Sequence, residues 1–137
     1  AEGATATAAG GTTSKTVKQA VPIKTARGKL DTEVTSSDKS TKNLILVGGP
    51  FVNTLVAELA TAGKTRAGQF YLDQGRGYAL LDYVANAFAS GKAALVVAGT
   101  SADDTRAVTG KLQNFDTAGL TGARMEWKNG VITTLPA

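Results

Sequence analysis

The sequence contains no cysteine and no histidine. These two absences remove the thiol nucleophile, the usual general base and the usual ligands of transition metals. Carboxylates, lysine and tyrosine can still catalyse reactions, so the composition lowers the odds of an enzyme without excluding one. Because no disulfide can form, cysteine usage does not indicate a redox compartment. We expect no catalytic residues and no resident cofactor.

The chain also lacks long apolar runs and concentrated charge. No stretch of about 18 apolar residues occurs, so we expect no membrane insertion. The net charge of +4 comes from basic residues that are dispersed along the chain. Because no dense lysine and arginine cluster is interleaved with aromatics, we expect no nucleic-acid partner. The 137 residues are 42% hydrophobic, which is enough for one compact domain plus a tail.

The N-terminal stretch is low in complexity. Residues 1–14 read AEGATATAAGGTTS, with Glu2 as their single charge, and none is large enough to build a core. One interpretation is a disordered tail. In the other, small residues alternating with Thr5 and Thr7 form a strand that orders only in a groove along another subunit's sheet edge. The sequence leaves both interpretations open.

The next stretch, from Thr16 to Arg27, has apolar residues among lysines. Because Pro22 lacks an N–H, we expect an edge strand or two short extended pieces. Residues 29–42 are polar and predict a loop, which could open with a short strand at Leu30–Val34. The chain through residue 42 holds 7 basic and 4 acidic residues, against 8 and 7 in the remainder. The excess of basic residues in this N-terminal part of the chain could help steer subunits together over short distances.

The stretch NLILVGGPFVNTLVAELATAG predicts a strand, a tight turn and a helix that ends at Gly63. Leu44–Val47 is a short apolar run, typical of a strand buried on both faces. Gly48 and Gly49 allow a sharp turn, and Pro50 suits the first turn of a helix. The apolar stripe of this helix is made by Val52, Leu55, Val56 and Leu59.

Further elements are predicted in the second half of the chain. The first two are a short strand at Gln69–Asp73 and an amphipathic helix at Tyr78–Ala89, which Ser90-Gly91 ends. A second buried strand follows at Ala93–Ala98, and a further helix starts at Thr100-Ser101. The last element is a hairpin of Ala123–Lys128 and Val131–Leu135 around Asn129-Gly130. Two buried strands, each followed by a helix, indicate parallel strands with right-handed crossovers.

We therefore predict a small Rossmann-like α/β sandwich. It has parallel core strands, extra antiparallel edge strands, a C-terminal β-hairpin and an extended N-terminal arm. The arm comprises residues 1–28 and the α/β domain residues 29–137. The added strands leave sheet edges that the chain itself or a partner must cover.

Three segments between roughly Lys29 and Asp116 carry more specific motifs. They are LDTEVTSSDKSTKNLILVGGPFVNTLVAEL, ALLDYVANAF and GKAALVVAGTSADDTRAVTGKL. NLILVGGP with an asparagine three residues later, and VAG followed by DDTR, resemble the C-terminal domain of archaeal S-layer proteins. The resemblance implies a secreted, self-assembling surface protein. S-layer proteins are usually long, so a chain of 137 residues could be a small relative that builds a filament or tube.

The glycine turn is the first candidate site. Backbone N–H groups at a helix start can bind an anion, so a phosphate could lie at Gly48 and Gly49. The turn lacks the later glycines of the dinucleotide motif and the lysine of the Walker motif, and Pro50 removes one donor. We interpret Gly48, Gly49 and Pro50 as a structural turn.

Asp103 and Asp104 are the second candidate. Adjacent helical residues point about 100° apart, so these carboxylates do not form an acid–base pair. Ser101 and Asp104 instead predict a helix cap, similar to a capping box with Asp in place of Glu. Neighbouring stretches do not resemble an EF-hand loop, and a calcium site built from distant loops stays open. The aromatics that could form a sugar platform are interpreted as core: Tyr71, Tyr78, Tyr83 and Trp127.

The sequence favours a secreted structural protein at the cell surface that assembles with itself into an extracellular filament, tube or S-layer lattice. The N-terminal arm would add a strand to a neighbour's sheet edge. The assembly residues of this hypothesis are Thr5, Thr7, Val17, Val21 and Ile23. The alternative is a module that binds cell-wall carbohydrate, or an anion at Gly48-Gly49. Cell-surface glycans are a further possible partner.

Overall fold

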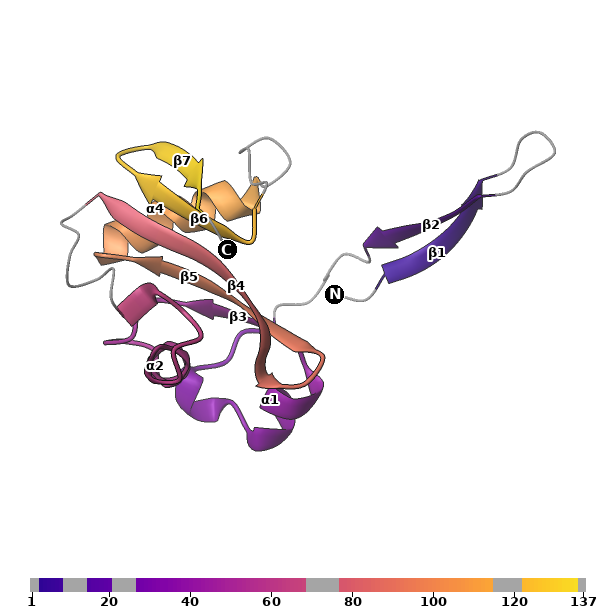
Figure 1. The fold of residues 1–137 in the computed structure, drawn as a ribbon, viewed down its shortest axis with the longest axis horizontal. Helices are drawn as coiled ribbons and strands as arrows, with labels where there is room; N and C mark the ends of the chain where they lie inside the picture. Colours follow the sequence, from indigo (N-terminus) through magenta and orange to yellow (C-terminus); the bar gives the residue numbers. More distant parts are fainter. Residues whose placement is uncertain (1–2, 9–14, 21–26, 69–76, 115–121, 136–137) are drawn as a thin grey trace.

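The computed structural model describes residues 3–8, 15–20, 27–68, 77–114 and 122–135 (Figure 1). The described elements are β1 (Gly3–Ala8), β2 (Lys15–Ala20), η1 (Asp31–Glu33), α1 (Ser36–Thr41), β3 (Leu44–Val47), α2 (Thr54–Thr61), β4 (Tyr78–Ala89), β5 (Lys92–Gly99), α4 (Ala102–Gln113), β6 (Arg124–Lys128) and β7 (Val131–Thr134). The predicted strand at Gln69–Asp73 lies outside the described residues. The mixture of helices and strands places the chain in the α/β class.

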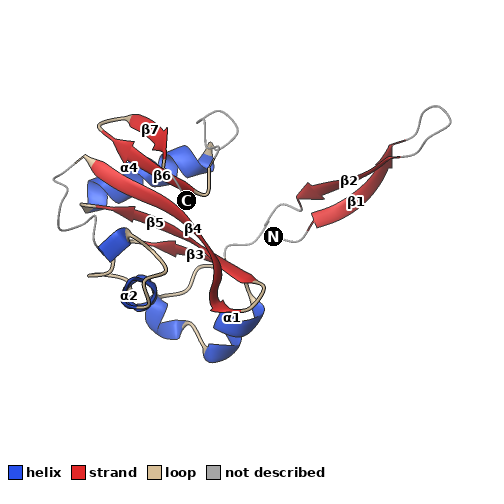
Figure 2. Cartoon of the chain, in the orientation of Figure 1, coloured by secondary structure: helices blue, strands red, loops and turns tan. Residues whose placement is uncertain are grey.

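The main sheet has five strands in the order β3-β5-β4-β6-β7 (Figure 2). β3 and β5 run parallel, with Leu46 opposite Val96, and the other neighbouring pairs are antiparallel. The parallel core expected of a Rossmann-like sandwich is thus limited to this one pair in a mixed sheet. β6 and β7 pair across Asn129 and Gly130, which both have positive φ angles.

Apolar side chains cover both faces of the sheet, and helices lie against each face. Most buried members of the first cluster come from β3, β4, β5 and α2, and include Leu46, Leu80, Val96, Val56 and Leu59. Those of the second come from β4, β5, α4 and β6, and are Ala79, Leu81, Val97, Val108 and Met125. Figure 1 shows α1 and α2 on one side of the sheet and α4 on the other.

The helix predicted at Tyr78–Ala89 is wrong, because these residues form the long strand β4. Leu80 and Leu81 fit a helical stripe in the sequence, but the structure directs them to opposite faces of the sheet. A strand buried on both faces shows no apolar–polar alternation, so its pattern also matches a helical period. Ser90 and Gly91, predicted to end the helix, instead connect β4 to β5, where Ala89 pairs with Lys92.

The loop predicted for residues 29–42, with its possible strand at Leu30–Val34, is also wrong. This segment forms η1 and α1. The Thr35 side chain accepts a hydrogen bond from Asp38 N (3.1 Å), and the Asp38 carboxylate accepts one from Thr35 N (3.0 Å). Each side chain thus satisfies an N–H at the start of α1, which is the function of a capping box.

α2 begins later than predicted but ends at the expected place. Asn53 is its N-cap and Thr54 its first residue, so Pro50 lies ahead of the helix, and Val52 is 77% exposed instead of joining the buried stripe. Gly63, at φ 70°, and Lys64 donate backbone hydrogen bonds to Ala60 O and Leu59 O. This pair of bonds is a Schellman motif.

The described residues of the N-terminal arm form two strands. β1 pairs antiparallel with β2, with Thr5 opposite Lys18 and Ala6 opposite Val17, so the described part of the arm forms a two-stranded ribbon. β2 covers the first part of the segment predicted as an edge strand or two short extended pieces, and residues 21–26 lie outside the described residues. β1 and β2 form a sheet of their own, and Figure 1 shows this ribbon apart from the α/β body.

Candidate assembly surface

The strand β3 forms one edge of the main sheet. It is the first strand in the sheet order, so it has a strand neighbour, β5, on only one side among the described residues. Leu46 is buried, whereas Ile45 is 62% and Val47 50% exposed. The strand predicted to be buried on both faces is therefore buried on one face only. An apolar run cannot by itself distinguish a central strand from an edge strand.

The backbone of β3 has N–H and C=O groups that point away from β5, to the open side of the strand. In a parallel pair, alternate residues bond to the neighbouring strand, and the residues between them direct their N–H and C=O groups away from it. Gly48 N donates to Val97 O of β5 (2.9 Å), so Ile45 and Val47 belong to the set that faces outward. The Val47 carbonyl accepts a bond from Asn53 Nδ2 (3.1 Å). The N–H and C=O groups of Ile45 both point to the open side of β3.

An apolar row crosses the sheet from this edge. Ile45 of β3 pairs with Leu95 of β5, and Leu95 pairs with Tyr83 of β4. Tyr83 is 54% exposed, and Leu95 is partly buried against the second cluster. The row lines an open hollow of about 540 Å³, whose rim includes the polar residues Asn43, Asn86 and Lys92. Water therefore contacts a patch of apolar side chains at the β3 end of the sheet.

The turn after β3 brings Gly48, Gly49 and Pro50 to the start of α2. Gly48 has φ 100°, and a Cβ atom on it would lie 2.9 Å from Val52 Cγ2, so a glycine suits this position. Three N–H groups at the start of α2 already have partners. Asn53 Oδ1 accepts from Leu55 N (3.0 Å) and Val56 N (3.3 Å), and Asp31 Oδ2 accepts from Thr54 N (2.7 Å).

This arrangement counts against an anion site at the turn. The bond from Thr54 N lowers the pKa of the Asp31 carboxyl, so this group carries its negative charge at the helix start. A second anion there would meet that charge. The structure therefore gives the alternative of an anion-binding module no support.

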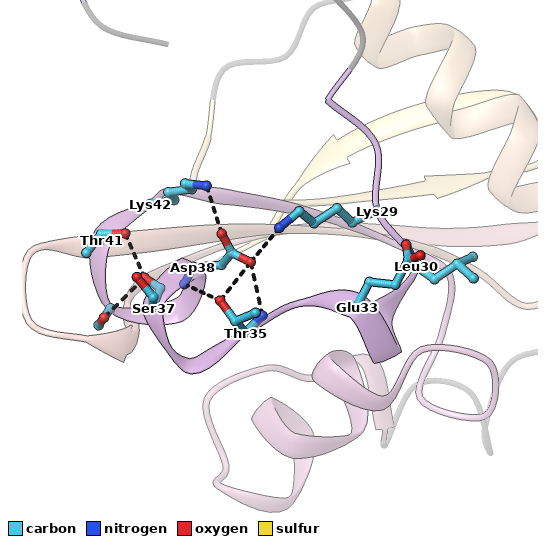
Figure 3. A network of polar contacts seen from close by, with 9 residues as sticks. Lys29, Leu30, Glu33, Thr35, Ser37, Asp38, Thr41 and Lys42 are labelled. Carbon is cyan, nitrogen blue, oxygen red and sulfur yellow. Dashed lines mark hydrogen bonds and ion pairs between the residues drawn. The ribbon is translucent and has the colours of Figure 1, made fainter.

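Asp38 joins the arm's exit to the start of β3 (Figure 3). Its carboxylate forms ion pairs with Lys29 (2.8 Å) and Lys42 (2.7 Å), and accepts a hydrogen bond from Thr35 Oγ1 (3.0 Å). Lys29, then Lys42, then Thr35 hold the pKa of this carboxyl far below its usual value. Lys29 follows the arm and Lys42 lies two residues before β3, so one buried carboxylate fixes both ends of the segment between arm and edge strand.

Two further buried aspartates tie the other elements together. Asp82 of β4 accepts hydrogen bonds from Thr65 Oγ1 (2.8 Å) and Arg124 Nε of β6 (3.1 Å). Asp104 accepts hydrogen bonds from Ser101 Oγ (2.7 Å) and from Gly77 N (3.0 Å). These carboxylates connect segments that are distant in sequence. Their partners are hydroxyl, backbone and arginine donors, which suits a structural role.

The residues of the predicted α4 cap lie together. Ser101 is the N-cap of α4, and its side chain accepts a bond from Asp104 N (3.1 Å). Asp103 is exposed and forms an ion pair with Arg106 (2.9 Å), whereas Asp104 is buried. The two adjacent carboxylates thus have separate partners. Among the described residues, no group of three acidic side chains could hold a metal ion.

The predicted assembly residues are placed only in part. Thr5 and Thr7 lie on β1 and Val17 on β2, while Val21 and Ile23 lie outside the described residues. The sequence did not single out Ile45, Val47 or Leu95 as surface residues, because their apolar runs resemble buried strands. Tyr78 is buried and Tyr83 lies on the opposite face of β4, so they do not form one sugar platform.

In comparisons with known proteins, the matching family model and the similar proteins are all of the S-layer kind. The sequence model of a family described as "S-layer like family, outer domain" matches residues 2–115. An S-layer protein of Methanothermococcus thermolithotrophicus is 44% identical over 89 residues, which is 65% of this chain and 14% of that protein. An S-layer protein of Methanocaldococcus jannaschii is 64% identical over 36 residues, or 26% of this chain and 6% of the relative.

An S-layer protein of Methanococcus voltae is 55% identical over 47 residues, which cover 34% of this chain and 8% of the relative. The chain thus spans a small fraction of the length of each of these relatives. No solved structure matches this chain. Within the described residues, no helix is both long and apolar enough to cross a membrane.

Proposed function

The chain belongs to the S-layer-like family, and from this membership we propose that it is a structural subunit of an archaeal cell surface that assembles with copies of itself. The match over residues 2–115 is the observation that carries the proposal. It includes the N-terminal ribbon and most of the α/β body. The relatives are S-layer proteins, and a surface layer is built from repeated contacts between subunits.

We propose that the assembled form is an extracellular filament, tube or lattice of a secreted protein. A contact between two different patches does not close on itself unless the rotation happens to form a ring, so it extends into a polymer. Residues 1–28 act as the assembly arm and residues 29–137 as the domain that carries it. The role needs no catalysis and no cofactor.

The arm contributes by strand exchange with a neighbouring subunit. A two-stranded ribbon is marginally stable by itself in water, whereas a ribbon added to a larger sheet gains main-chain hydrogen bonds and a packed face. The separate sheet of β1 and β2 supports this proposal. Thr5, Thr7 and Val17 are the described positions at which a neighbour would be contacted.

A truncated chain tests the role of the arm. Deleting residues 1–26 should abolish sedimentable polymer while circular dichroism and a cooperative melting transition show that the body stays folded. A full-length variant with Lys15→Gln and Lys18→Gln is the matched control, because it removes charge from β2 but keeps both strands. Normal polymer from the truncated chain would contradict the arm's role.

A ligand screen addresses the alternative of a binding module. A monomer whose melting temperature rises with added glycan or phosphate would favour that alternative, since a ligand that binds only the folded state stabilises it. We expect no such shift, because the chain's own side chains occupy the N–H groups of Thr54, Leu55 and Val56.

A further inference from the structure

We propose that the open edge of β3 is the acceptor for strand β1 of a second copy of this chain. The inference rests on the proposed assembly and adds to it the surface on the receiving subunit. Pairing of the two strands across copies would give a continuous sheet in the order β2-β1-β3-β5-β4-β6-β7. The α/β body supplies β3 through β7, and the neighbour supplies the ribbon.

The chemistry of the β3 edge fits an added strand. Ile45 directs its peptide N–H and C=O groups to the open side, and its side chain is largely exposed beside the Leu95–Tyr83 row. Native edge strands are usually protected by lysine, proline, a bulge or a covering segment. β3 contains no lysine and no proline, and its protection consists of its short length of 4 residues and the Asn53 bond to the Val47 carbonyl.

The ribbon is the occupant that the chain itself offers. β1 reads GATATA and carries no charge, whereas β2 carries Lys15 and Lys18. Because lysine on an edge disfavours pairing, β1 is the side of the ribbon that is open to another strand. Its small residues suit a neighbour with bulky side chains such as Ile45 and Val47. Residues 1–28 contain 4 basic residues and 1 acidic residue. Placing uncharged β1 against the edge leaves the lysines of β2 on the far side.

The other edge of the sheet fits less well. In β7, Val131 is exposed at the turn, and the positions that follow include Thr133 and Thr134. Gly122 approaches the Thr134 side chain so closely that a Cβ atom there would collide with it. Leu135 N donates to Arg124 O of β6 (2.8 Å), which continues the pairing beyond β7. At the β7 edge the paired apolar residues Trp127 and Ile132 are partly buried against the second cluster, whereas Ile45 at the β3 edge is 62% exposed.

Two lysine substitutions, one on each edge strand of the main sheet, test which edge is the acceptor. Ile45→Lys in the full chain should raise the concentration required for polymer, measured by light scattering, by about tenfold or more, because it removes an apolar contact and places a charge in the strand junction. Val131→Lys is the matched control, since Val131 is 64% exposed on the opposite edge strand. It should assemble like the unmodified chain.

The outcomes distinguish this inference from the proposed function. If both variants polymerise normally, assembly stands but the β3 edge is not the acceptor. If Val131→Lys alone blocks polymer, the acceptor is β7. An unmodified chain that stays monomeric overturns both the acceptor assignment and the proposed assembly. Because Ile45 and Val131 are exposed, each variant should keep the melting temperature of the unmodified chain.

Crosslinking identifies the strand that occupies the edge. The chain has no cysteine, so an introduced thiol is unique. Separately purified Thr5→Cys and Ile45→Cys chains, mixed under assembly conditions with a short bismaleimide, should give a covalent heterodimer, and Thr5→Cys with Val131→Cys should not. A heterodimer with Val131→Cys only would overturn the inference. So would a Thr5→Cys/Ile45→Cys double variant that crosslinks only within one chain, because the ribbon would then cover its own edge.

Discussion

At the scale of single residues, buried carboxylates connect segments that no local pattern would bring together. Asp38, Asp82 and Asp104 are almost fully buried, and each has polar or charged partners. Burying a charge is costly unless it is paired and hydrogen-bonded. Removing a partner of one of these three carboxylates should therefore cost more stability than removing an exposed charge. The protonation of at least one of them should also make stability depend on pH.

Asp38 is expected to make stability pH-dependent. Its pKa lies well below the ordinary value of 3.8, because Lys29 and Lys42 favour the carboxylate in the folded state. A lowered folded pKa gives stabilisation that is present above the unfolded pKa and is lost as the pH falls through the folded pKa. Asp38→Asn should therefore lower the melting temperature at pH 7, and the difference from the unmodified chain should shrink steadily below about pH 4.

Thermal unfolding followed by circular dichroism from pH 7 down to pH 2 measures this difference. Asp103→Asn is the control, because the Asp103 side chain is 89% exposed and its ion pair with Arg106 is also exposed. Exposed pairs contribute little to stability. If the melting temperatures of Asp38→Asn and the unmodified chain differ by the same amount over the whole pH range, the lowered pKa of Asp38 does not contribute to stability.

Gly48 is expected to resist substitution. Its φ of 100° disfavours any residue with a Cβ atom, and Val52 Cγ2 occupies the space in which that atom would lie. Gly48→Ala should lower the free energy of unfolding by about 1–2 kcal/mol in urea denaturation. Gly110→Ala is a matched control, because Gly110 lies in α4 with nothing within 4 Å of its Cβ position. That control should be neutral or stabilise by up to about 1 kcal/mol.

At the scale of elements, the sequence was informative where an element has clear ends. The end of α2 before Gly63 and the start of α4 after Ser101 were predicted from their terminal residues, and the structure has these helix ends there. The strands β3 and β5 follow from short apolar runs between turn residues. In α1, the Thr35–Asp38 spacing was a capping signal in the sequence, but the polar residues around it favoured a loop.

β4 could not be recognised because it is buried on both faces. Its first five residues are all buried, so its pattern lacks the alternation that marks a half-exposed strand. The surface row of Ile45, Leu95 and Tyr83 could not be predicted either. Each residue belongs to a different strand, and only the sheet order brings them side by side. Sheet order depends on tertiary packing and not on local sequence.

The Asp82–Arg124 pair is expected to stabilise the junction of β4 and β6. Asp82 is 1% exposed, and the Arg124 side chain is also mostly buried. Removing one member of a buried pair leaves the other charge without compensation, so Asp82→Ala should lower the free energy of unfolding by about 3 kcal/mol. Urea denaturation of Asp82→Ala, Arg124→Ala and the double variant measures the coupling. Additive losses would show that the two side chains do not act as a pair.

At the scale of the whole molecule, the chain combines a folded body with a ribbon that belongs to a separate sheet. Ion pairs of Asp38 with Lys29 and Lys42 connect the two ends of the segment that leads from the arm to β3, and this segment joins the proposed donor to the proposed acceptor strand. An arm and an edge that meet in different copies give a heterologous contact, and such contacts build open polymers.

Negative-stain electron microscopy of the full chain, at increasing concentration, shows whether the protein assembles by itself. Ordered filaments, tubes or sheets should form above a threshold concentration, and light scattering should rise at the same concentration. Assembly should not require an added ligand, because the proposed contact is made by the protein alone. A chain that stays monomeric at every concentration, including with calcium added, would contradict the central claim that this protein is a self-assembling structural subunit.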